Sequence, residues 1–178
     1  MSAGWPVAEL DTVRQLRVLS AALPGTAIVE RVLSVPFDVV WPRIEDMEHM
    51  VPAFDPLVAD LRIVARDGEH LTVRARTTAT PVWTRFDVTL RRGFFWMQSR
   101  LYVVGMAAVA EGDNHTRYAH VEGAPFRHAP ERLMRPIMRR VIRTDVDGIE
   151  RLTASAAASG ATGSGDPPSA PPAAEPPN

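Results

Sequence analysis

Three polar side chains alternate with apolar ones in a single short stretch of the chain. In the segment RYAHVEGAP, Tyr118, His120 and Glu122 are separated by Ala119 and Val121. On a β-strand, alternate residues share one face, and their Cα atoms lie roughly 6.7 Å apart. A histidine that titrates near neutral pH, between a phenol and a carboxylate, offers the groups needed for general acid–base catalysis.

Two orientations of this strand are open from the residues alone. If the polar row faces a cavity, His120 is the candidate general acid or base, and Tyr118 is the candidate donor to a carbonyl group. The same row can instead tune the polarity of a cavity through hydrogen bonds, without chemistry. The apolar residues Ala119 and Val121 favour the opposite orientation, with the polar row in water. The spacing also argues against a dyad of His120 and Glu122.

Composition excludes several classes of protein. The chain has 178 residues, of which 46% are hydrophobic, so one domain with a sizeable core is expected. Its net charge of -1 predicts no nucleic-acid partner and no binding to anionic membranes. It has no cysteine, which excludes disulfides and thiolate metal sites. No signal peptide and no membrane-spanning run is visible, so we expect a cytoplasmic protein. Every basic residue is an arginine, as is common in GC-rich bacterial genomes, so we also expect a bacterial protein.

Strand-like segments joined by tight turns fill the middle of the chain. The pair Asp67-Gly68 separates two such segments and is typical of a hairpin turn. Apolar and polar side chains alternate over residues 71–76, so one face of that strand is expected to be buried. About seven sequential strands predict an antiparallel meander, over residues 26–35, 57–66, 70–80, 82–92, 93–103, 105–112 and 115–123.

Helices are predicted at both ends of this meander. Residues 131–152 carry an apolar stripe at three- and four-residue spacings, which predicts a helix roughly 33 Å long. A short helix is predicted over residues 36–47. An amphipathic helix before Pro24-Gly25 packs on the domain or forms a dimer contact. The predicted organisation is an N-terminal helical extension, a ligand-binding domain and a disordered Ala/Pro/Gly/Ser-rich tail, over residues 1–25, 26–153 and 154–178.

The order of these elements, together with two local patterns, resembles a known superfamily. After the first strand comes a proline, then two aliphatic residues, a tryptophan and an aspartate, at Pro36, Val39, Val40, Trp41 and Asp46. Residues 114–118 form a polar turn followed by threonine and a strand. Residues 26–152 thereby resemble the START/Bet v1-like superfamily, in particular its polyketide cyclase/dehydrase-like branch. The resemblance implies an α+β helix-grip fold, in which a curved antiparallel sheet wraps around a long C-terminal helix, with an extra N-terminal helix in this chain.

The resemblance also implies where a ligand is bound. In aromatase/cyclases of this superfamily, alternate residues of the equivalent strand face the pocket, which implies that the polar row faces inward. A cavity between helix and sheet is where small apolar ligands bind. We therefore predict that a hydrophobic or polycyclic small molecule contacts a set of mostly large side chains from the sheet and the helices: Trp41, Phe54, Val73, Phe86, Met97, Tyr118, His120, Glu122, Met134, Met138 and Ile142.

Three functions remain open at this point. The leading hypothesis is binding of a hydrophobic ligand such as a lipid. The alternative is a polyketide aromatase/cyclase that uses His120 and Tyr118 and needs no cofactor. The third is a protein-interaction module with a filled cavity. The carboxylates and histidine of residues 45–49 are a weak metal signal, so no metal site is predicted. The sequence leaves the oligomeric state open.

Overall fold

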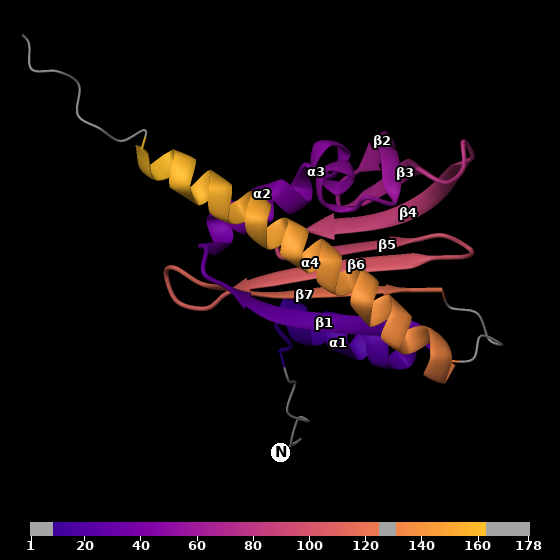
Figure 1. The fold of residues 1–178 in the computed structure, drawn as a ribbon, viewed down its shortest axis with the longest axis horizontal. Helices are drawn as coiled ribbons and strands as arrows, with labels where there is room; N and C mark the ends of the chain where they lie inside the picture. The colour runs from indigo at the N-terminus through magenta and orange to yellow at the C-terminus, as the bar shows by residue number, and fades with distance from the viewer. Residues whose placement is uncertain (1–8, 125–130, 163–178) are drawn as a thin grey trace, which may run out of the picture.

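One curved antiparallel sheet organises the molecule (Figure 1). The structure is a computed structural model, which describes residues 9–124 and 131–162. Neighbouring strands are hydrogen-bonded in the order β1-β7-β6-β5-β4-β3-β2, so the first strand pairs with the last. The strands are β1 Thr26–Leu33, β2 Val58–Asp67, β3 His70–Thr77, β4 Trp83–Arg91, β5 Phe94–Gln98, β6 Val103–Ala110 and β7 Thr116–Gly123.

The predicted seven-stranded antiparallel sheet is confirmed, and so is its clearest turn. The sequential meander runs only from β2 to β7, because β1 lies at the far edge beside β7. Strands β2 and β3 pair up to the register Asp67 with His70. Between them, Gly68 has φ of +57°, in the left-handed region that glycine enters at little cost. The Asp-Gly pair therefore closes the hairpin as its residue types indicate.

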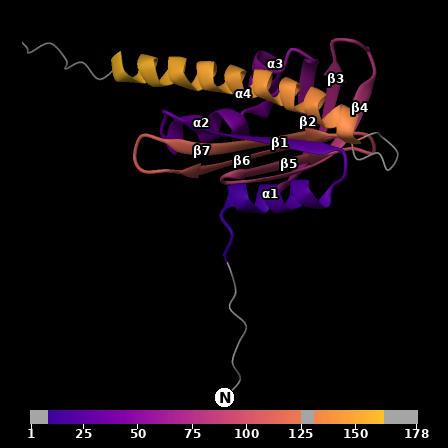
Figure 2. The same ribbon diagram turned by 60° about the horizontal axis from the view of Figure 1, so that its bottom comes forward.

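Within the described residues, four helices cover the two faces of the sheet unequally. Figure 2 shows α4 across one face with α2 and α3 on the same side, and α1 alone on the opposite side. Their bounds are α1 Thr12–Ala22, α2 Phe37–Glu45, α3 Met47–Phe54 and α4 Glu131–Thr162. We call the face toward α4 the inner face and the face toward α1 the outer face. This arrangement is the α+β helix-grip architecture, with its additional N-terminal helix.

Helix α4 is longer than its apolar stripe indicates. It continues past Leu152 to Thr162, through residues that composition assigns to a disordered tail. The added segment is rich in alanine, the best helix former. Ala157 in this extension also packs against the inner core, together with Leu152. The predicted tail from residue 163 onward lies outside the described residues.

Helix α1 is built into the outer face. Val13 and Leu16 are fully buried and pack with apolar residues of the sheet, including Ala119 and Val121 of β7. Its N-cap is Asp11, whose side chain accepts a hydrogen bond from the backbone N–H of Arg14 at 2.9 Å. The packing predicted for this helix is therefore confirmed, and β7 is covered on both faces.

Candidate functional site

Strand β7 turns its polar row to the inner face. Tyr118, His120 and Glu122 are all buried, with 3% exposure or less, on the side of α3 and α4. The intervening Ala119 and Val121 are buried equally well against α1. The alternation of apolar and polar residues along β7 cannot show which of its faces meets the cavity. Helix α1, which is distant in sequence, covers the outer face, so the apolar residues of β7 are buried there and not on the inner face.

A chain of hydrogen bonds joins these side chains. The Tyr118 hydroxyl lies 3.2 Å from Nδ1 of His120, and Nε2 of His120 lies 3.0 Å from Oε1 of Glu122. The hydroxyl of Tyr102, just before β6, donates to Oε2 of Glu122 at 2.5 Å. Every contact is satisfied when Nε2 carries the imidazole proton, because Tyr118 then donates to Nδ1 and Nε2 donates to the carboxylate. The result is a continuous chain of hydrogen bonds along the inner face.

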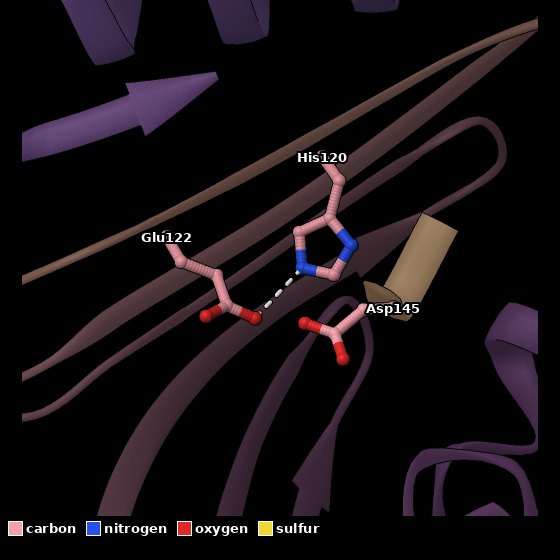
Figure 3. Close-up of side chains that lie close together, drawn as sticks. All are labelled: His120, Glu122 and Asp145. Carbon is pink, nitrogen blue, oxygen red and sulfur yellow. Dashed lines mark hydrogen bonds and ion pairs between the residues drawn. The ribbon is translucent and has the colours of Figure 1, made fainter. Parts of the chain in front are cut away.

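The expectation that His120 and Glu122 lie too far apart for a dyad is wrong. It used the distance between Cα atoms, whereas long side chains lean along their strand. Figure 3 shows the imidazole and the carboxylate turned toward each other, joined by the 3.0 Å contact. The His120 ring also packs against the ring of Phe54 of α3 in a T-shaped arrangement, with centroids 6.5 Å apart. The imidazole is thus held on three sides.

Two aspartates complete the cluster from the helices. Asp145 of α4 is 1% exposed, and its Oδ2 has no hydrogen-bond partner in the described part of the chain. Burial, the charges of Glu122 and Asp55, and a hydrogen bond with Glu122 together raise the pKa of Asp145 to about 8. Burial likewise raises the pKa of Asp55, which follows α3. Asp145 therefore keeps a proton at neutral pH.

Glu122 is the carboxyl that carries the charge. Burial alone would raise its pKa, but the hydrogen bond and charge of His120 and the hydroxyl of Tyr102 outweigh burial, and the pKa is lowered. Burial and the same carboxylate raise the pKa of Tyr102, so that hydroxyl stays protonated and donates. One ionised carboxylate, one protonated carboxyl and one imidazole therefore stand side by side.

A cavity of about 310 Å³ lies beside this cluster on the inner face. Most of its wall is apolar, from α3 and from strands β3 to β6. A cluster of its polar groups lies at one place, where Asp55, Tyr102, His120 and Glu122 meet. Arg76, Thr77, Thr84 and Ser99 are its other polar lining residues. Two further lining residues, Leu57 and Leu101, are 52% and 60% exposed, so they mark the mouth. The arrangement suits a mainly apolar molecule that carries a hydrogen-bonding group at one end.

The structure distributes the predicted ligand contacts between the cavity and the core. Phe54, Phe86 and Met97 line the cavity with His120 and Glu122.

The other predicted contacts do not line this cavity. Trp41, Val73, Tyr118 and Ile142 are fully buried in the core, because neighbouring side chains pack around them on all sides. Met138 packs partly buried against the same core. The side chain of Met134 lies outside the described residues.

Sequence reasoning missed three polar residues of the site: Tyr102, Asp55 and Asp145. Tyr102 and Asp55 belong to no pattern in the sequence, since each sits alone among apolar neighbours. For Asp145 a signal was available, because it interrupts the apolar stripe of α4 next to Val146. At residues 45–49, where the sequence gives only a weak metal signal, the structure has an exposed pair of side chains. Nδ1 of His49 lies 2.7 Å from Oδ1 of Asp46.

Comparisons with known proteins bear on the fold. No protein-family model and no curated protein matches the chain. Among solved structures, a START superfamily protein from Mycobacterium smegmatis matches with a TM-score of 0.58 and 11% identity, over 74% of this chain and 98% of that one. The Zhui aromatase/cyclase from Streptomyces sp. R1128 matches with a TM-score of 0.56 and 12% identity, over 72% of this chain and 93% of that one. Ara h 8.0201 matches with a TM-score of 0.51 and 12% identity, over 73% of this chain and 97% of that one.

The chain has the fold of the START and Bet v1-like proteins. At these identities the likeness establishes the fold alone, since one such scaffold carries many functions. No helix in the described ranges is long and apolar enough to cross a membrane.

Proposed function

We propose that this chain binds a small, mainly apolar molecule in the inner cavity and orients it by one polar group. The observation that carries this proposal is the gathering of Asp55, Tyr102, His120 and Glu122 at one point of a mainly apolar wall. A volume of about 310 Å³ is at the lower end of the range for small-molecule sites, roughly 300–1,000 Å³. The ligand class is therefore a compact hydrophobic compound with a carbonyl or hydroxyl group.

Two features support a ligand rather than a filled core. The exposed Leu57 and Leu101 give the cavity an apolar mouth through which such a molecule can enter. The polar groups are also organised in advance, because each of Tyr102, His120 and Glu122 is already held by a hydrogen bond. Preorganised groups reduce the cost of ordering on binding.

Displacement of a fluorescent apolar probe tests this function. We expect the wild-type chain to bind 1-anilinonaphthalene-8-sulfonate, and native mass spectrometry of the protein from its source cells to show a bound small molecule. Ala75→Leu places a larger side chain into the cavity and should weaken probe binding at least about tenfold, since the added volume excludes ligand.

Ala53→Leu, on the exposed side of α3, is the matched control and should bind the probe like wild type. Binding that is equal in Ala75→Leu and Ala53→Leu, or no binding at all, would overturn the proposal.

A second candidate function is acid–base catalysis on the bound molecule, as in a polyketide aromatase/cyclase. The contact of His120 with Glu122, both on the cavity wall, favours it. Both ring nitrogens of His120 are engaged, so we infer that Glu122 exchanges the proton with the ligand and that His120 and Tyr118 relay it. Turnover of a poly-β-ketone chain should fall in His120→Ala and in Tyr118→Phe. Unchanged turnover in both would exclude this role.

Cellular location and partners are further parts of the proposal. We infer that the chain has no nucleic-acid partner, because the net charge is only -1, and we propose a cytoplasmic location. Fractionation of source cells, followed by immunodetection of the chain, checks the location.

A further inference from the structure

Three side chains from β7 and α4 lie close enough to share one metal ion. His120, Glu122 and Asp145 each offer a ligand atom, and these atoms all lie within 4.8 Å of one another. Figure 3 shows the imidazole and the two carboxylates converging on the same small volume from two sides. The three residues are at most 3% exposed, so water does not compete freely for the positions between them.

The distances match those between ligands of a first-row transition metal. Nitrogen and oxygen ligands bind such ions at about 2.1 Å, so two of them at a right angle are about 3.0 Å apart. Nε2 of His120 and Oε1 of Glu122 are separated by 3.0 Å. Both atoms can therefore bind one ion with little movement of the strand.

Asp145 supplies the observation that calls for a positive ion. Its Oδ2 is buried and unpartnered among the described residues, although it belongs to a side chain that meets Glu122. A buried oxygen without a partner is costly. A bound cation would satisfy Oδ2 and would release the proton that Asp145 otherwise shares with Glu122. No ion pair joins an arginine to Asp145 or Glu122 in the described part of the chain, so no guanidinium balances the charge of this cluster.

We propose that His120, Glu122 and Asp145 bind one divalent transition-metal ion of the Mn²⁺, Fe²⁺ or Zn²⁺ class. An imidazole together with two carboxylates suits these ions, whereas Mg²⁺ and Ca²⁺ prefer oxygen ligands alone.

For Nε2 to bind the ion, the imidazole proton moves to Nδ1, which then donates to the Tyr118 oxygen. A hydrogen bond of this kind commonly orients histidines that bind metals.

The site would also reach the cavity. His120 and Glu122 line the cavity, whereas Asp145 comes from α4 and is not among its lining residues. The ion would keep coordination positions open toward a ligand oxygen, where it can polarise a carbonyl group. Metal binding does not require the proposed ligand, so the two proposals fail separately.

Metal content and affinity test the site without any organic ligand. The wild-type chain is stripped with a chelator and then titrated calorimetrically with Mn²⁺, with Zn²⁺ and, without oxygen, with Fe²⁺. We expect one ion to bind per chain, and Asp145→Asn to weaken its affinity at least about tenfold. The matched control is Asp147→Asn on the same helix, because Asp147 is half-exposed and its partner Arg31 keeps Glu150.

An anomalous-scattering map of a crystal soaked in Mn²⁺ decides the matter independently of the variants. A peak between His120, Glu122 and Asp145 is expected. No uptake by the wild-type chain, equal affinity in Asp145→Asn and Asp147→Asn, or a peak only at the exposed Asp46 and His49 would overturn the proposal. If Asp145→Asn loses its fold by circular dichroism, Glu122→Gln replaces it in the titration.

Discussion

The two faces of β7 are both buried, yet they are built on opposite principles. On the outer face, Ala119 and Val121 fit closely under α1, and the neighbouring Gly105 leaves no room for a side chain. On the inner face, Tyr118 and His120 stand in a polar network beside a cavity of about 310 Å³. Close packing contributes stability, whereas an incompletely filled, polar interior costs stability and is kept where a site is needed.

Removing the anchor of α1 should have the largest effect on stability. Leu16 is fully buried in the outer cluster, so Leu16→Ala is expected to lower the free energy of unfolding by about 2–5 kcal/mol. Urea denaturation followed by circular dichroism measures the loss. Val18→Ala, on the exposed side of the same helix, is the control and should change stability by less than about 0.5 kcal/mol. Equal losses in the two variants would mean that α1 is not part of the core.

Adding a methyl group to the same layer should have the next largest effect. A Cβ at Gly105 would lie 2.6 Å from Cδ1 of Leu16 and 2.8 Å from Cε3 of Trp96. Gly105→Ala is therefore expected to cost about 1–3 kcal/mol through overpacking. The double variant with Leu16→Ala should lose less than the sum of the two single losses, because the smaller residue makes room. Additive losses would contradict the close packing of this face.

The cap of α1 should make a smaller contribution that depends on pH. The pKa of Asp11 is lowered: burial opposes this, but the Arg14 backbone N–H and the guanidinium of Arg117 outweigh it. A carboxyl with a depressed pKa stabilises the fold above its unfolded pKa, near 3.9, and the contribution disappears as pH falls through the folded pKa. Asp11→Ala should cost about 0.5–2 kcal/mol at pH 7 and progressively less below about pH 4.

Denaturation curves at a series of pH values measure this dependence. The control is Asp11→Asn, which can still cap the helix but cannot ionise. The difference in the free energy of unfolding between Asp11→Asn and Asp11→Ala should not vary over the same range of pH. A wild-type advantage over Asp11→Asn that persists below the folded pKa would contradict the assignment.

Filling the inner face should have the smallest effect on stability. Ala75 lines the cavity, so in Ala75→Leu the added atoms enter empty space, and we expect a change below about 1 kcal/mol in the free energy of unfolding. Thermal unfolding of Ala75→Leu beside Gly105→Ala measures the contrast between the faces directly. A loss in Ala75→Leu as large as that in Gly105→Ala would mean that the inner face is as tightly packed as the outer one.

Much of the fold follows from local patterns. The Asp67-Gly68 turn, the alternation in β3 and the apolar stripe of α4 each predict an element that is present. The sequence predicts an end of α4 that is too early. The alanine-rich residues after Leu152 have the composition of a disordered tail, but alanine is also the best helix former. The site was predictable only in part, since its residues on β7 share a pattern whereas Asp55, Tyr102 and Asp145 come from three other places.

The sequence by itself determined the order of strands and helices and the row of polar residues on β7, because periodicity is a local property of the chain. Only the tertiary structure decided which face of that strand meets the cavity. A helix about a hundred residues earlier makes the outer face apolar, so hydrophobicity along β7 gives no preference. Only the tertiary structure also brings Asp145 to His120 and Glu122, because that contact depends on how α4 crosses the sheet.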